Sequence, residues 1–200
     1  MEQLDLLDYK RQVLDLYARI RAEPDPETGW RDWVVTRDRL FKTHQSSALP
    51  EAERAAFTGL PCFDHDPAAR VLAELTPSDG KRFEIPTSGE DAMAFTSFAV
   101  ARFTLFGQEL ELEAYWLQSY GNGLFLPFAD ATSGKETYGA GRYLLDTVKG
   151  SDLGTRDGRL VLDFNLAYNP SCAYDPRWTC PLAPPANRLD VPVRVGEKSP

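Results

Sequence analysis

The spacing of hydrophobic residues changes near residue 70, and this change constrains the fold more than any other feature of the sequence. Before it, apolar residues recur at three- and four-residue steps over residues 3–22 and again over 27–41, which is typical of amphipathic helices. Pro24 and Pro26 separate the two segments, because a proline disfavours helix at the residue before it. We therefore predict an N-terminal helical hairpin, followed by a short helix that begins at Pro50.

From Val71 onward, short segments rich in β-branched and aromatic residues are separated by turn residues, which is typical of strands. No helical pattern lies between them, so an antiparallel barrel or sandwich is favoured over a parallel sheet. Phe106-Gly107-Gln108 joins two alternating runs and is the best hairpin candidate, although it lacks the Asn-Gly pair that would fix a two-residue turn. The predicted strands cover residues 71–75, 82–86, 94–100, 102–106, 109–117, 123–128, 142–148, 159–164 and 191–195.

The predicted fold class is therefore α+β, with an N-terminal helical hairpin followed by a mainly antiparallel β-barrel or sandwich. Residues 1–200 are expected to form a single domain, in which a mainly helical part (1–58) packs on an antiparallel β part (69–200). A chain of 200 residues with 42% hydrophobic content is sufficient for one such core.

Charge and hydropathy exclude two classes of partner. The formal net charge of −8 argues against nucleic acid, because nucleic-acid affinity depends on Lys and Arg side chains that neutralise phosphates. No apolar run approaches the roughly 20 residues of a membrane span, and acidic residues stand near the N-terminus where a signal peptide would be basic. We expect no membrane association and a cytoplasmic location. The sequence identifies neither a cofactor nor a protein partner.

The three cysteines, Cys62, Cys172 and Cys180, form an odd count with no repeated spacing. This fits reduced thiols better than a disulfide framework, and a Cys172–Cys180 disulfide stays open as the alternative. Their spacing also lacks the short ligand pairs of zinc sites, so we assign no metal ligand.

Polar residues and glycines concentrate in two stretches of the second half of the chain. Residues 130–143 combine flexible glycines with an acid, a hydroxyl and a cation, which are Glu136, Tyr138 and Arg142. Residues 163–169 follow a predicted strand and contain a carboxylate and two amides that can orient a ligand. The alternative is that such residues form turns by bonding to their own backbone.

One hypothesis is a small-molecule site where Gly134–Tyr143 meets Asp163–Cys172 and the segment around Asn187. The expected ligand is a small anionic or carbonyl-bearing molecule, and His44 or Glu136 would transfer a proton if the site is catalytic. The predicted ligand-binding residues are Tyr138, Arg142, Asp163, Asn165, Asn169 and Asn187.

The alternative hypothesis is a non-catalytic structural or protein-interaction module, in which the same residues form an internal hydrogen-bond network. Buried Arg and Asn side chains must be paired, and breaking such a network costs several kcal/mol. The two hypotheses differ in their expectation for Arg142→Ala. A binding residue would lose ligand affinity with little loss of stability, whereas a network residue would lose stability sharply.

The motifs themselves resemble a known family. The runs PFADATSGKETYGAGRYL, VLDFNLAYNPSCAY and TCPLAPPANRLDVPVRVGEK resemble the domain-of-unknown-function 1684 family of bacterial and archaeal proteins. FKTHQSSAL and FTGLPCFDHDP are similar to its earlier segments, so the resemblance extends from about residue 30. It implies no substrate, cofactor or catalytic residue. All eight candidate residues fall on the family's recognisable positions. Cys62 and His65 lie within FTGLPCFDHDP but are not among those positions, which lowers the case for a metal at those two.

Overall fold

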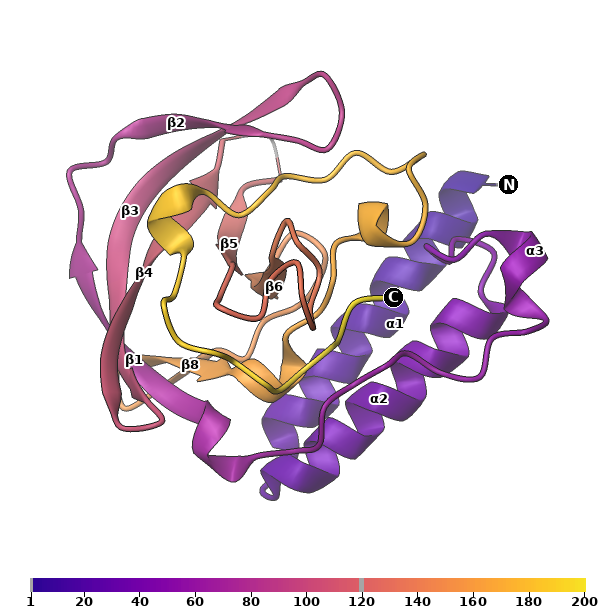
Figure 1. The fold of residues 1–200 in the computed structure, drawn as a ribbon, viewed down its shortest axis with the longest axis horizontal. Coiled ribbons are helices and arrows are strands. Elements are labelled where there is room, and N and C mark those ends of the chain that lie inside the picture. The colour runs from indigo at the N-terminus through magenta and orange to yellow at the C-terminus, as the bar shows by residue number, and fades with distance from the viewer. Residues whose placement is uncertain (1, 119–120) are drawn as a thin grey trace.

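The computed structural model describes residues 2–118 and 121–200, and it begins with two long helices that pack side by side (Figure 1). They are α1 (Glu2–Ala22) and α2 (Pro26–Thr43), and a third short helix, α3, spans Glu51–Arg54. Asp25 caps α2, because its carboxylate accepts hydrogen bonds from the N–H groups of Glu27 and Thr28. The predicted helical hairpin and short third helix are confirmed.

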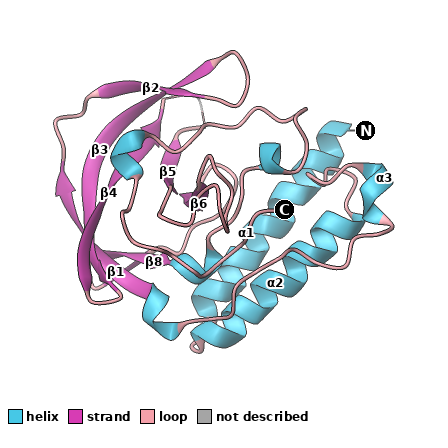
Figure 2. Cartoon of the chain, viewed as in Figure 1, coloured by secondary structure: helices cyan, strands magenta, loops and turns pink. Residues whose placement is uncertain are grey.

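The strands that follow the helices form one antiparallel sheet, which curls into a half-barrel (Figure 2). Its order is β6-β5-β4-β3-β1-β8-β7, and β2 also pairs with β3. The α+β prediction is confirmed, with a single curled sheet in place of a closed barrel or two stacked sheets. The strands are β1 (Arg70–Pro77), β2 (Arg82–Pro86), β3 (Ala92–Leu105), β4 (Gln108–Leu117), β5 (Gly123–Phe128), β6 (Arg142–Asp146), β7 (Thr155–Arg156) and β8 (Arg159–Asp163).

The predicted hairpin at Phe106 and Gly107 is confirmed. Leu105 pairs with Gln108, so the loop has two residues, and both have positive φ, 50° and 78°. This geometry is the mirror-image turn that matches the twist of the flanking strands. The segments predicted as 94–100 and 102–106 are one strand, β3, because it continues through an irregularity between Ser97 and Ala99.

The prediction of a strand at residues 191–195 is wrong. These residues run as an irregular segment, because side chains of the 130–142 region bind their backbone N–H and C=O groups in place of a neighbouring strand. The strand β7 was missed, since two residues carry no periodicity. Four short 3-10 helices complete the chain, namely η1 (Pro67–Ala69), η2 (Phe164–Leu166), η3 (Ser171–Ala173) and η4 (Pro185–Asn187).

The main core fills the concave side of the sheet. Phe103 and Phe128 from the sheet share it with Trp33 from α2, and the C-terminal segment adds Val193 and Val195. That segment, yellow in Figure 1, crosses the open side of the half-barrel towards the helices. No helix among the described residues is long and apolar enough to span a membrane.

Candidate functional site

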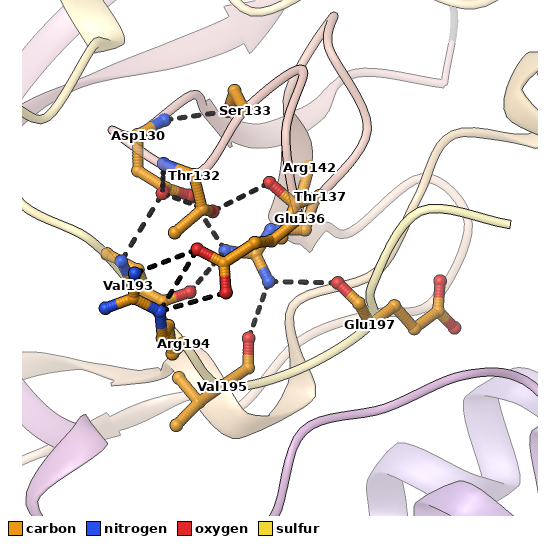
Figure 3. Close-up of polar contacts among 10 residues, drawn as sticks. All are labelled: Asp130, Thr132, Ser133, Glu136, Thr137, Arg142, Val193, Arg194, Val195 and Glu197. Atoms are coloured by element: carbon orange, nitrogen blue, oxygen red, sulfur yellow. Dashed lines mark hydrogen bonds and ion pairs between the residues drawn. The ribbon is translucent and has the colours of Figure 1, made fainter.

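Arg142 lies at the start of β6 and is the centre of a buried polar network (Figure 3). Its Nη2 donates to Oδ2 of Asp130 (2.8 Å) and to the carbonyl of Val193 (2.9 Å). Its Nη1 donates to the carbonyls of Val195 (2.5 Å) and Glu197 (3.1 Å). The side chain is 1% exposed, and its four Nη hydrogen bonds all go to the protein itself, whereas its buried Nε has no partner among the described residues. Arg142 therefore holds the C-terminal segment against the sheet.

Asp130 extends the same network and is completely buried. Its Oδ1 accepts hydrogen bonds from the backbone N–H of Thr132 (2.7 Å), from the hydroxyl of Thr132 (2.6 Å) and from the N–H of Val193 (3.3 Å). Burial lowers the pKa of Arg142, and the Asp130 carboxylate opposes that shift. The ion pair and its hydrogen bonds thus fix the positions of both the 130–141 loop and the C-terminal segment.

Two of the predicted asparagines bridge separate backbone segments in the same manner. The amide of Asn165 donates to the carbonyl of Asp66 (2.9 Å) and accepts from its N–H (2.8 Å). The amide of Asn187 donates to the carbonyls of Glu113 (2.9 Å) and Pro127 (2.7 Å) and accepts from the Glu113 N–H (2.9 Å). Each side-chain amide therefore satisfies backbone N–H and C=O groups of a distant segment, as a neighbouring strand would.

Asp163 completes this set of buried residues. Its Oδ1 accepts from the side-chain amide of Asn165 (2.9 Å), and its Oδ2 accepts from Arg70 (2.9 Å). Arg142, Asp163, Asn165 and Asn187 are each at most 2% exposed. Their ligand-binding roles stay predictions, and the geometry gives all four the protein contacts that the alternative hypothesis expects.

The two predicted proton-transfer residues lie on different parts of the molecule and share no contact. His44 ends α2, where its Nε2 lies 3.2 Å from Oδ2 of Asp8 and its Nδ1 accepts the N–H of Ser46 (3.0 Å). Glu136 forms a partly exposed ion pair with Arg194, and that hydrogen bond lowers the pKa of Glu136. A proton-transfer role for either His44 or Glu136 stays a prediction.

One predicted residue, Asn169, lines a partly open cavity between the two long helices and the chain that follows β6. We call it the Arg37 cavity. Its volume is about 70 Å³, which holds a few water molecules or one small polar group. It is lined by Tyr9, Val13, Tyr17, Arg37, Phe41, Tyr143, Lys149, Ser151, Tyr168, Asn169, Pro170 and Ser171.

Arg37 forms the charged side of this cavity. Its Nε and Nη2 both donate to Oε1 of Glu197 (2.8 and 2.5 Å), and Glu197 is completely buried. The guanidinium also lies about 5 Å from the ring centres of Trp33, Phe41 and Tyr168. These rings and the carboxylate fix its orientation and balance its charge.

Three polar groups of the residues that line the cavity have no hydrogen-bond partner among the described residues. Oδ1 of Asn169 is buried and unpaired, while the Nδ2 of the same amide donates to Tyr174 (3.2 Å) and to the carbonyl of Lys198 (2.7 Å). The hydroxyl of Tyr9 and the Nη1 of Arg37 also lack a partner within that part of the chain. The cavity thus offers two donors and one acceptor.

Burial keeps the tyrosines of the cavity neutral. It raises the pKa of Tyr9, raises that of Tyr17 to about 12, and raises that of Tyr168 well above its usual value. The Tyr168 hydroxyl lies 3.0 Å from Oγ of Ser151, and Lys149 adds a half-exposed cation at the rim. At neutral pH these hydroxyls are hydrogen-bond donors rather than bases.

Sequence reasoning missed Arg37 although a signal was present. Its spacing from Trp33 and Phe41 places it on the apolar stripe of the second predicted helix, where a charged residue needs a buried partner. That partner, Glu197, lies 160 residues further along the chain, and no pattern in the sequence joins the two.

Tyr138, the remaining predicted residue, lies away from the Arg37 cavity. Its hydroxyl is 3.9 Å from Sγ of Cys172, and burial together with that sulfur raises the pKa of Tyr138 to about 12.

Over the described residues, no three His, Cys, Asp or Glu side chains are grouped as metal ligands would be.

The fold and this network define an α+β protein in which a curled antiparallel sheet, a helical hairpin and the C-terminal segment are joined by buried ion pairs. The chain belongs to the family described as protein of unknown function (DUF1684), whose model matches residues 55–198, so the predicted family is confirmed. It is similar to an uncharacterized protein of Haloarcula marismortui solved by solution NMR, with 35% identity, a TM-score of 0.61, and coverage of 86% of this chain and 93% of that one. No curated protein matches the chain.

Proposed function

We propose that the protein binds a small carbonyl-bearing molecule in the Arg37 cavity. The observation that carries this proposal is the buried, unpaired Oδ1 of Asn169, a residue that lines the cavity together with Tyr9 and Arg37. A buried polar atom without a partner is costly, so a ligand that supplies the partner gains that free energy.

The chemistry of the wall defines the class of ligand. Because Glu197 neutralises Arg37, the cavity selects for matched hydrogen bonds more than for net charge. A carbonyl or carboxylate oxygen accepts from Arg37 Nη1 and the Tyr9 hydroxyl, and a hydroxyl or amide hydrogen of the ligand donates to Asn169 Oδ1. Lys149 at the rim favours anionic members of this class. Hydroxy acids and small amides fit these requirements.

The proposal is tested by titrating the 15N-labelled protein with acetate, acetamide, glycolate and glycolamide while recording amide chemical shifts. We expect glycolate, glycolamide and acetamide, which each carry both an acceptor and a donor, to bind more tightly than acetate, which has no donor, with shifts centred on Tyr9, Ser151 and Asn169. Shifts scattered over the surface, or none at millimolar probe, would count against the proposal.

Tyr9→Phe removes one cavity donor and keeps the ring. We expect it to weaken glycolamide or glycolate binding by about fivefold to tenfold, the value of one hydrogen bond, without lowering the melting temperature. Tyr138→Phe is the matched control, because its hydroxyl contacts Cys172 outside the cavity and its loss should leave affinity unchanged. Equal effects of the two variants would contradict this assignment.

The internal network favours the alternative function for the motif residues themselves. Arg142, Asn165 and Asn187 bind backbone groups of distant segments, which is the arrangement of a structural scaffold. The two functions are compatible, because Glu197 both accepts from Arg37 and lies on the segment that Arg142 holds.

A further inference from the structure

Two cysteines that lie apart in the sequence motifs meet in the structure. Cys172 lies in η3, and Cys180 lies on an extended segment whose backbone pairs with Ser88, by bonds of 2.9 Å from the Ser88 N–H and 3.1 Å to its hydroxyl. Both cysteines are free thiols, and the interaction between their side chains changes the pKa of each.

The two sulfurs have different environments. Cys180 is 2% exposed, whereas Cys172 is partly exposed and lies 3.9 Å from the Tyr138 hydroxyl. Hydrogen bonds from Cys180, Ser88 and Tyr138 lower the pKa of Cys172 to about 6, against the opposing effect of burial. The same contact raises the pKa of Cys180, and Lys149 opposes that shift. The partly exposed Cys172 therefore has more thiolate character than the buried Cys180.

We propose that Cys172 and Cys180 form a dithiol that reacts with hydroperoxides, with the accessible Cys172 as the attacking sulfur and the buried Cys180 as the resolving one. Attack of the Cys172 thiolate on a peroxide oxygen breaks the O–O bond, giving a sulfenic acid and, with a proton, water. The Cys180 sulfur then attacks the Cys172 sulfur, forming the S–S bond and releasing the sulfenic oxygen as a second water. Two thiols thus lose two electrons and two protons to hydrogen peroxide.

The third cysteine provides an internal control. Cys62 is partly buried near Arg37 and Glu197 but away from the Cys172 cluster, and burial raises its pKa to about 12. It therefore carries almost no thiolate at neutral pH and should react slowly with peroxide. Neither Cys172 nor Cys180 lines the Arg37 cavity, so the dithiol is independent of ligand binding there.

The test is oxidation of the reduced, full-length protein with one equivalent of hydrogen peroxide at pH 7, followed by alkylation and peptide mapping. We expect an intramolecular Cys172–Cys180 disulfide, a mass lower by two hydrogen atoms, and Cys62 recovered in alkylated form. Dithiothreitol should restore both thiols. Oxidation of Cys62 before the pair, or disulfides only between molecules, would overturn the proposal.

A resolving role for Cys180 requires one further result. In Cys180→Ser, Cys172 should stop at the sulfenic acid, so dimedone labelling of Cys172 after peroxide should rise at least several-fold above that of the wild type. Unchanged labelling in a folded variant would remove Cys180 from the mechanism. The wild-type peptide map decides the main claim even where the variant fails to fold.

Discussion

Arg142→Met should lower the free energy of unfolding by about 3 to 5 kcal/mol, measured by urea denaturation. Methionine retains much of the side-chain volume but leaves the Asp130 carboxylate buried without its cation and frees the carbonyls of Val193 and Val195. The total free energy of unfolding of a small domain is only about 5 to 15 kcal/mol, so the variant is expected to be barely folded at 37 °C.

Arg194→Met is the matched control for that experiment. Arg194 also pairs with a carboxylate, Glu136, but its side chain is 59% exposed. Exposed ion pairs contribute about 0 to 1 kcal/mol, so the control should remain close to the wild type. Equal, small effects of both substitutions would show that the buried network is not what holds the C-terminal segment, and would favour the ligand-binding hypothesis for Arg142.

Glu197→Ala should have a comparable effect, again about 3 to 5 kcal/mol of unfolding free energy. This carboxylate accepts from Arg37, from the N–H of Asn169 (2.7 Å) and from the hydroxyl of Tyr174 (2.9 Å), and the substitution leaves these three donors without their acceptor. Glu136→Ala removes a carboxylate from the partly exposed pair and serves as the control.

The same pair of variants separates stability from binding. If Glu197 orients Arg37 in the cavity, any folded fraction of Glu197→Ala should also lose glycolamide binding, whereas Glu136→Ala should retain it. A stable Glu197→Ala variant would contradict the role assigned to this ion pair. Retained binding in the folded fraction would instead separate the proposed site from Arg37.

The results for the Arg142 and Glu197 variants will distinguish between the two roles that the motifs allow, ligand binding and an internal structural network. The polar residues around 130–143, 163–169 and 187 stand out in the sequence because each has several hydrogen-bonding groups. Such a composition suits a ligand site and a buried network equally well, since both require donors and acceptors in fixed positions. Only the partners distinguish them, and here the partners of Arg142, Asn165 and Asn187 are backbone groups of the chain itself.

The sequence by itself determined the helical hairpin, most of the strands, the turn at Phe106 and Gly107, and the family. The helices, strands and turn depend on residues within one turn or a few positions of each other, so hydrophobic periodicity and turn chemistry report them directly, whereas the family follows from the resemblance of its motifs. The segment 191–195 shows the limit of this approach. It alternates like a strand, but its backbone is bound by the side chains of Arg142 and Asp130 rather than by another strand.

Tertiary structure decided which polar residues meet. Arg37 and Glu197 are separated by 160 positions, and the cavity beside them is built from both helices and from residues 143–171. The contact between Cys172 and Cys180 likewise depends on how η3 and the following extended segment fold over the end of β2. Side-chain pairing over such distances follows from packing of the whole core, and no local pattern in the sequence encodes it.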